Sequence, residues 1–367
     1  MDFRLDDEQL ALAAAVRAAV ERRARQRDMR DFLGGGYDAE LWATLCRQVG
    51  VAALAVPEAY GGAGATSFET HIVLEQLGAS LTPTPLLGSA VAIRALLLGA
   101  RDRERSRLLP GLAAGDTVGA LAWADGAGRW RTDVAPLVAR RTGETWRLAG
   151  VSTLVVDGGR AGVLLAVGQT DAGPVLFEVT GSARVTRTPA LDPTLDLAAV
   201  AFDGTEAVPL GSGLGLEALL AEAACAVTAL QVGGAQAALD RTVRYLGQRH
   251  QFGRPIGSFQ ALKHRAADML VDVETARSIS WWAAWAVAHR EPGYIRRASV
   301  AKAWCSDAFA KVAAETIQLH GGVGITWEHD AHLYFKRAHA TAQLFGDARR
   351  HRGRVRAGHA TETFMQA

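Results

Sequence analysis

The chain has 367 residues, of which 49% are hydrophobic and 21% are charged, and its formal net charge at pH 7 is +2. A single hydrophobic core stops growing at roughly 250–300 residues, so this length predicts two or three packed modules. The acidic and basic residues are mixed along the chain, without a long basic run carrying aromatic side chains, which argues against a nucleic-acid partner.

The cysteine content and the apolar stretches indicate a cytoplasmic protein. Cys46, Cys225 and Cys305 are widely spaced and form no CxxC pair, so we expect neither a disulfide framework nor a metal site. The N-terminus, MDFRLDDEQL, is acidic where a signal peptide would be basic and then apolar. Apolar stretches such as 279–287 are too short to span a bilayer, so we expect no membrane segment.

The first 117 residues carry helical patterns. Leu12, Val16 and Val20 recur at four-residue spacing, which predicts a helix with one apolar face. Asp6, followed three residues later by Gln9, resembles a capping box at the start of that helix. Further helices are expected at residues 39–49, 67–77, 85–98 and 101–113.

The pattern changes after residue 117, where short β-rich runs alternate with turn signals at roughly ten-residue spacing. The segments Asp157-Gly158-Gly159 and Asp171-Ala172-Gly173 are typical turn sequences. Strands are expected at residues 146–148, 153–156, 163–167, 175–179 and 198–202. A small antiparallel sheet or barrel is the natural interpretation.

The rest of the chain returns to long, Ala-rich helical patterns that suit a four-helix bundle, because small residues allow helices to approach closely. These helices are expected at residues 216–249, 258–289, 296–319 and 331–345. The predicted fold class is therefore α+β. Its expected parts are an N-terminal helical domain (1–117), a middle antiparallel β domain (118–206) and a C-terminal four-helix bundle domain (207–367).

The segment RHQFGRPIGSFQALK, residues 249–263, is the most informative stretch. Arg249 lies in the last turn of a long helix, where its charge suits the helix dipole and its forked guanidinium could bind a phosphate. Phe252 offers an apolar face beside it, and Ser258 is a good N-cap for the next helix. The spacing alone also fits a capped helix–turn–helix with a solvated arginine.

A second segment, QLHGGVGIT at residues 318–326, follows the third of the long helices. Its glycines permit tight turns and close approach of the backbone to a ligand. Helix termination explains such a loop equally well, so this segment alone is a weak signal.

Taken together, the two segments resemble the acyl-CoA dehydrogenase family. The resemblance extends over nearly the whole chain, through the α–β–α order, the opening FRLDDEQ and the loop VPEAYGGAG. It implies the acyl-CoA dehydrogenase fold and a tetrameric FAD enzyme that desaturates an acyl-CoA substrate between Cα and Cβ. In such enzymes a carboxylate removes the α-proton, the flavin accepts the β-hydride, and an electron-transferring flavoprotein takes the electrons.

The resemblance also implies a set of cofactor-binding residues. In the family, the residues of these two segments hold the adenosine diphosphate arm of the FAD in a neighbouring subunit. The matching positions here are Arg249, Gln251, Phe252, Gln260, Gln318, Gly321 and Gly322.

The residues that would surround the flavin ring depart from the family pattern. A TEPGAGSD-like segment is replaced by WADGAGRW, in which Trp123 and Arg129 stand where the family has hydroxyl side chains. The family's Trp-[IV]-[TS] strand is replaced by Leu154-Val155-Val156, which has neither an indole nor a hydroxyl. We expect Trp123 to occupy space that a flavin edge would need.

The catalytic base is also missing from both of its usual positions, which fall on Phe345 and Ala223. Asp347 and Glu222 lie close by in sequence and are the weak candidates. One residue along a helix is a rotation of about 100°, and a general base must come within about 3 Å of its proton. The catalytic residue therefore remains unassigned.

The half of the site that serves a neighbour's cofactor is kept, whereas the half that performs chemistry is lost. This pattern resembles the catalytically incomplete subunit of heteromeric (α2β2) actinobacterial acyl-CoA dehydrogenases, in which an unlike partner carries the base. Two alternatives remain: a homotetrameric dehydrogenase with a relocated base, and a non-redox relative that acts in binding or assembly. The sequence does not select the acyl group, whether linear, branched or sterol-derived.

Overall fold

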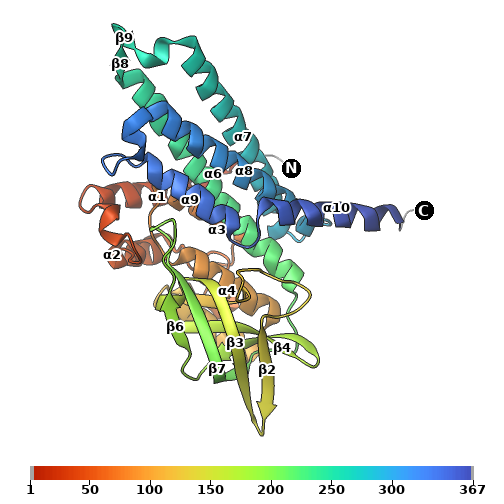
Figure 1. Cartoon of the computed structure of the whole chain (residues 1–367). Helices are drawn as coiled ribbons and strands as arrows, with labels where there is room; N and C mark the ends of the chain where they lie inside the picture. The colour runs from red at the N-terminus through yellow and green to blue at the C-terminus, as the bar shows by residue number, and fades with distance from the viewer. Residues whose placement is uncertain (1–3, 365–367) are drawn as a thin grey trace.

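The computed structural model describes residues 4–364 and places a β domain against one end of an extended assembly of helices (Figure 1). The predicted fold class is confirmed: N-terminal helices come first, a sheet follows, and a helical bundle completes the chain.

The first helix, α1 (Asp7–Ala24), begins with the predicted capping box. The backbone N–H of Gln9 donates to Asp6 Oδ1 at 2.8 Å, and the backbone N–H of Asp6 donates to Gln9 Oε1 at 3.2 Å. The other N-terminal elements are η1 (Met29–Phe32), α2 (Ala39–Thr44), η2 (Leu45–Val49), η3 (Glu58–Tyr60), α3 (Ser67–Ser80), α4 (Leu86–Gly99) and α5 (Asp102–Ala113).

The sheet closes on itself as a barrel, because β4 pairs with both β2 and β5, and β5 in turn pairs with β7. Most pairings are antiparallel, as expected, but β1–β4 and β2–β4 are parallel. Its strands are β1 (Gly119–Ala122), β2 (Leu137–Thr142), β3 (Thr145–Val156), β4 (Val163–Thr170), β5 (Gly173–Val179), β6 (Arg184–Arg187) and β7 (Leu197–Pro209), with η4 (Gly158–Arg160) after β3.

The C-terminal bundle is built from four long helices, and a fifth helix projects from the body of the molecule (Figure 1). The bundle helices are α6 (Leu216–Gln248), α7 (Gln260–Ala288), α8 (Tyr294–His320) and α9 (Ala331–Gln343). The connecting elements are β8 (His250–Gln251), β9 (Arg254–Pro255), η5 (Ile256–Ser258) and η6 (Gly321–Ile325), and the projecting helix is α10 (Ala348–Phe364).

Two sequence expectations need correction here. The prediction that Ser258 caps a helix is wrong: α7 begins at Gln260 with Phe259 at the N-cap, and Ser258 Oγ donates to the carbonyl of Pro255 at 2.7 Å. The helix α10 was not predicted, because its arginine-rich sequence shows no clear apolar face.

The long helix α6 is the centre of the molecule. It is apolar enough to pass for a membrane span, but 89% of its most apolar window is buried inside the protein, as in the core helix of a bundle. It lies unusually close to α3: a Cβ on Gly78 would fall 2.5 Å from the Leu230 carbonyl oxygen, and one on Gly233 would fall 1.9 Å from the Glu75 carbonyl oxygen. Glycine at both positions lets the N-terminal and C-terminal helices share one core.

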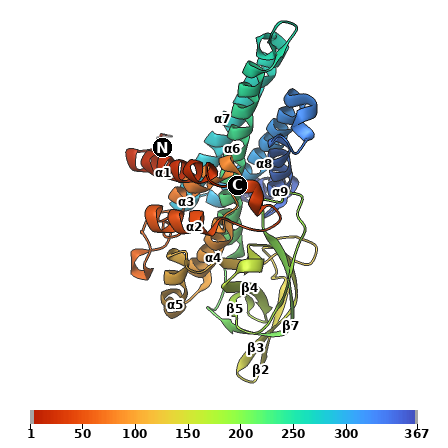
Figure 2. The ribbon, with the colours of Figure 1, turned by 90° about the vertical axis from the view of Figure 1, so that its left-hand side faces the viewer.

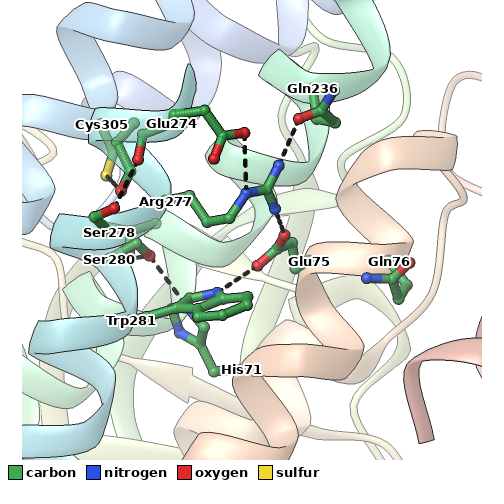
Figure 3. A network of polar contacts seen from close by, with 12 residues as sticks. His71, Glu75, Gln76, Gln236, Glu274, Arg277, Ser278, Ser280, Trp281 and Cys305 are labelled. Atoms are coloured by element: carbon green, nitrogen blue, oxygen red, sulfur yellow. Dashed lines mark hydrogen bonds and ion pairs between the residues drawn. The ribbon is translucent and has the colours of Figure 1, made fainter. Parts of the chain in front are cut away.

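A buried polar network joins the same helices (Figure 3). The carboxylate of Glu75 on α3 accepts hydrogen bonds from Arg277 and from the indole of Trp281, the latter at 2.8 Å, both on α7. Arg277 also donates to Gln236 Oε1 on α6 at 2.6 Å. Because these buried groups satisfy one another, the three helices are held in one register.

Candidate functional site

The two motif segments meet at one end of the bundle, which we call the hairpin end (residues 245–260 and 318–325). The ring of Tyr245, near the end of α6, stacks on His320, the last residue of α8, with 4.5 Å between ring centroids. The β8–β9 hairpin follows α6, with Gln251 paired to Arg254. Figure 2 shows this hairpin extending away from the β domain.

The candidate cofactor residues at the hairpin end all face solvent in the single chain: Arg249, Gln251, Phe252, Gln260, Gln318, Gly321 and Gly322. Phe252 is the extreme case, because the residue is 90% exposed and has a φ of +51°. A non-glycine residue in this left-handed region is strained, and an exposed aromatic ring gains nothing from burial. Nothing inside the chain accounts for this presentation, which suits a molecule that binds from outside.

The guanidinium of Arg249 is available to bind an anion. Its backbone N–H donates to the Tyr245 carbonyl at 2.8 Å, and its carbonyl accepts from Ile256 at 2.8 Å, so the main chain is fixed at the helix end. Within residues 4–364 its side chain makes no hydrogen bond or ion pair. A fixed backbone with an unengaged guanidinium is the arrangement expected of a phosphate ligand.

The two glycines of the second segment behave differently. Gly321 has a φ of +65°, which favours glycine by itself. Gly322 lies outside the left-handed region, and a Cβ there would meet nothing within 4 Å. A molecule that approaches the backbone of Gly322 from outside would give glycine a purpose at this position.

A second region lies between the β domain and the helices, where a small cavity contains about 270 Å³ of empty space. Its walls include Trp123, Trp130, Leu154 and Phe345, and we call it the aromatic cavity. Trp123 is only 1% exposed, and its indole N–H donates to the Arg131 carbonyl at 3.1 Å.

The departures noted in the sequence converge in this cavity, although they come from three distant segments. The rings of Trp130 and Phe345 lie 5.2 Å apart, and Leu154 and Val156 complete the wall from β3. None of the described residues that line the aromatic cavity carries a carboxylate. Bulky apolar side chains therefore occupy the region to which the resemblance assigned a flavin ring and a base.

Asp347, one of the two weak candidates for the base, acts as a helix cap. Its Oδ1 accepts from the backbone N–H of Arg350 at 2.8 Å, in the first turn of α10, and its side chain is exposed. It does not line the aromatic cavity. Its geometry is that of a structural carboxylate.

Glu222, the other candidate, is buried between two arginines. Arg94 approaches Oε1 with Nη2 and Oε2 with Nε, both at 2.7 Å, and Arg290 approaches Oε1 at 2.7 Å. Both carboxylate oxygens are thus engaged by guanidinium groups. Glu222 lines a larger cavity of about 620 Å³, bounded mainly by α3, α4, α6 and α7, which we call the apolar cavity.

Two buried titratable residues near these cavities were missed as functional groups by sequence reasoning. Asp157, expected only as a turn residue, ends β3 and accepts from the backbone N–H of Gly88 in α4 at 3.1 Å, while burial raises the pKa of its carboxyl to about 7. His71 lines the apolar cavity, and burial lowers its pKa to about 3. Only tertiary packing distinguishes either residue from an ordinary Asp or His.

Family models match most of the chain. The model of the N-terminal domain of acyl-CoA dehydrogenases matches residues 6–116, and that of the C-terminal domain matches residues 212–359. The chain belongs to the acyl-CoA dehydrogenase family.

Individual relatives agree with this membership. The chain is 37% identical over 358 residues to acyl-CoA dehydrogenase IpdE2 of Mycolicibacterium smegmatis, covering 96% of this chain and 99% of the relative. It is similar to a chain of the ChsE4–ChsE5 complex from Mycobacterium tuberculosis, with 30% identity, a TM-score of 0.87 and coverage of 98% and 99%. It is also similar to a chain of the Tcur3481–Tcur3483 steroid dehydrogenase, with 29% identity, a TM-score of 0.85 and coverage of 97% and 99%.

The two regions fit a family cofactor unequally. The hairpin end offers an unengaged guanidinium, an exposed aromatic ring and an open glycine backbone, which suit a nucleotide with phosphates. The aromatic cavity, by contrast, is filled by Trp123, Trp130 and Phe345 and does not suit a flavin ring in the conformation described. Within residues 4–364 no cluster of His, Cys, Asp or Glu is placed to hold a metal ion.

Proposed function

We propose that this chain is the catalytically incomplete subunit of an FAD-dependent acyl-CoA dehydrogenase. It supplies the binding site for the adenosine arm of FAD to an unlike partner subunit, and that partner carries the catalytic base and surrounds the flavin ring. The assembly desaturates an acyl-CoA thioester in the cytoplasm and passes electrons to an electron-transferring flavoprotein.

One contrast carries the proposal. The residues that match the family's adenosine-arm site lie exposed at the hairpin end, whereas the positions around the ring and the base are filled by buried aromatic side chains. A complete enzyme needs both halves in usable form. A half-site needs only the first.

In this proposal the residues of the hairpin end bind and orient. The guanidinium of Arg249 pairs with a phosphate, Phe252 covers an apolar part of the nucleotide, and Gly321 and Gly322 let the ligand approach the backbone. Gln251, Gln260 and Gln318 supply amide donors and acceptors. FAD, when bound, supplies the hydride acceptor, while the proton transfer belongs to a carboxylate of the partner.

Two relatives give the heteromeric form its plausibility, because each is a chain of a two-component assembly: the ChsE4–ChsE5 complex and the Tcur3481–Tcur3483 steroid dehydrogenase. The second name also makes a steroid-derived thioester a reasonable first substrate to test. These are properties of the relatives, and for this chain they remain part of the proposal.

A homotetramer with a relocated base is the second candidate. It is favoured only by the position of Glu222 on the wall of the apolar cavity. Against it, both carboxylate oxygens are already held by Arg94 and Arg290, so the base would first have to leave its partners.

The test is to count flavin per chain. The protein is purified alone and after co-expression with a second acyl-CoA dehydrogenase-like chain, and bound flavin is measured by absorbance after denaturation. The proposal expects a nearly colourless protein alone and about half a flavin per chain in the complex, since one FAD would serve each unlike pair. A yellow, active protein purified alone would favour the homotetramer. Absence of flavin with every partner tried would favour a non-redox relative.

A further inference from the structure

The apolar cavity is a well-formed compartment that the proposed half-site does not use. It contains about 620 Å³ of empty space, within the range of roughly 300–1,000 Å³ that is usual for small-molecule sites. Its walls are mostly aliphatic and come from α3, α4, α6, α7 and the segment at residues 51–55. Only Val91 lines both this cavity and the aromatic cavity, so the two spaces are neighbours.

A cluster of three charged residues stands at one side of this apolar space. Glu222 is paired with both Arg94 and Arg290, so the cluster contains one more cation than anion. Its members come from α4, α6 and the turn after α7, and no local motif brings them together. The side chain of Glu222 is 2% exposed and that of Arg94 is 21% exposed, so the excess charge is poorly hydrated.

Arg94 is the member of the cluster that is positioned to bind something else. It lines the cavity, and among the described residues its only partner is Glu222. Its Nη1 amino group makes no hydrogen bond within residues 4–364. Arg290, in contrast, also donates to the hydroxyl of Tyr294 at 3.1 Å.

His71 provides a second polar group on the same wall (Figure 3). One ring nitrogen, Nε2, lies 3.0 Å from Ser280 Oγ. The other, Nδ1, is buried and has no partner among the described residues. An unsatisfied buried polar atom in a native protein calls for an explanation, and a polar group on a bound molecule would provide one.

We propose that the apolar cavity binds a compact apolar molecule that carries one carboxylate, with Arg94 as the partner of that carboxylate. An uncharged hydrocarbon would leave the excess guanidinium charge buried and unpaired, whereas a carboxylate neutralises it. The carboxylate can belong to a free acid or to the far end of a dicarboxylic acyl-CoA. The site does not depend on flavin at the hairpin end, so it can be tested on the chain alone.

The experiment is isothermal titration of the full-length chain at neutral pH with four probes: decanoate, decanol, decanoyl-CoA and the CoA thioester of sebacic acid. Decanoate and decanol share a ten-carbon body and differ in charge. The two thioesters differ in the same way at the far end of the acyl chain. The proposal expects the carboxylate member of at least one pair to bind at least about tenfold more tightly than its neutral counterpart, because a charge-assisted hydrogen bond is lost in the neutral one.

Three variants separate the cavity from its charge. Arg94→Gln should erase the preference for the carboxylate probe, and Ala226→Phe, which fills the cavity without touching the cluster, should abolish binding of every probe. Arg103→Gln removes an exposed arginine of α5 and should change nothing, which controls for net charge.

The outcomes distinguish the source of the carboxylate and can overturn the site. A preference for decanoate assigns a free acid, and a preference confined to the sebacic thioester assigns a dicarboxylic acyl-CoA. Equal binding of charged and neutral probes, or no binding of any probe, contradicts the proposal. If Arg94→Gln fails to fold, undiminished binding by Ala226→Phe still contradicts it. None of these results depends on the flavin count, so failure here leaves the half-site proposal standing.

Discussion

The hairpin end and the aromatic cavity resolve the same ancestral site into two opposite fates. At the hairpin end the chain holds Phe252 90% exposed and leaves the guanidinium of Arg249 without a partner within residues 4–364. At the aromatic cavity it buries Trp123 at 1% exposure and packs Trp130 against Phe345. The first region spends no stability on its own contacts, whereas the second has become part of the core.

The difference teaches how a family member can lose chemistry without losing the fold. Filling a cavity with well-packed aromatic side chains stabilises a chain, and it needs no change in the helices around it. Exposed polar residues, by contrast, are retained only if something outside the chain uses them. Substitutions in the two regions should therefore separate stability from cofactor binding.

The largest expected effect is on stability at the aromatic cavity. Trp123→Ala should lower the free energy of unfolding by about 3–5 kcal/mol, because it removes a large buried side chain and leaves a cavity. Trp327→Ala is the matched control near the hairpin end, since that residue is 58% exposed, and it should have a much smaller effect. Chemical denaturation of both variants measures this. Equal losses would show that the two regions do not differ in the way described.

The next effect is a pH dependence in the same buried region. The pKa of Asp157 is raised from 3.8 to about 7, so the folded chain keeps this proton over a pH range in which the unfolded chain has lost it. Stability from this group is present below about pH 4 and is lost as the pH rises towards 7. Asp157→Asn should therefore gain on the wild type by something on the order of 3 kcal/mol between pH 4 and pH 7.

Denaturation of wild type and Asp157→Asn at pH 4, 5, 6 and 7 checks this dependence. Asparagine can still accept the hydrogen bond from Gly88, so the comparison isolates the charge. A difference in stability that stays constant across the series would mean that Asp157 is not held protonated in the folded chain.

The third effect should appear in cofactor retention and not in stability. Arg249→Ala, in the complex with the partner, should weaken FAD binding by about 10- to 100-fold, because a charge-assisted contact to phosphate is lost. The melting temperature of the chain alone should not change, since the Arg249 side chain makes no contact within residues 4–364. Arg244→Ala, another exposed arginine on α6, serves as the control. Full flavin occupancy in dialysed Arg249→Ala complex would remove Arg249 from the site.

The smallest effect is expected at Asp347. Asp347→Ala should cost about 1 kcal/mol of stability, because the cap on Arg350 N–H is lost. Dehydrogenase activity of the complex, measured with an artificial electron acceptor, should be unchanged at saturating substrate. Loss of turnover with the flavin content intact would instead make Asp347 the relocated base.

Local sequence signals predicted most of the fold. The capping box at Asp6 and Gln9, the long apolar periodicity of α6 and the turn sequences of the β domain each depend on neighbours a few residues apart. The same reasoning missed α10, and it placed a cap at Ser258 where Phe259 stands. The parallel pairings of β1 and β2 with β4 are long-range choices that turn signals do not encode.

The candidate site divides in the same way. The residues of the hairpin end are contiguous motifs, so the resemblance could name them, although whether they bind FAD stays a prediction. The convergence of Trp130 with Phe345, and of Arg94 with Glu222 and Arg290, joins residues far apart in the chain. Such contacts are products of tertiary packing and leave no periodic or spaced signal in one sequence.

The most direct measurement is the structure of the flavin-loaded assembly with its partner chain. The account predicts that the side chain of Arg249 lies within hydrogen-bond distance of the FAD pyrophosphate, while the isoalloxazine ring and the catalytic carboxylate belong to the partner's half of the site. An isoalloxazine ring seated beside Trp123 and Phe345 of this chain, with one of its own carboxylates above the substrate, would contradict it.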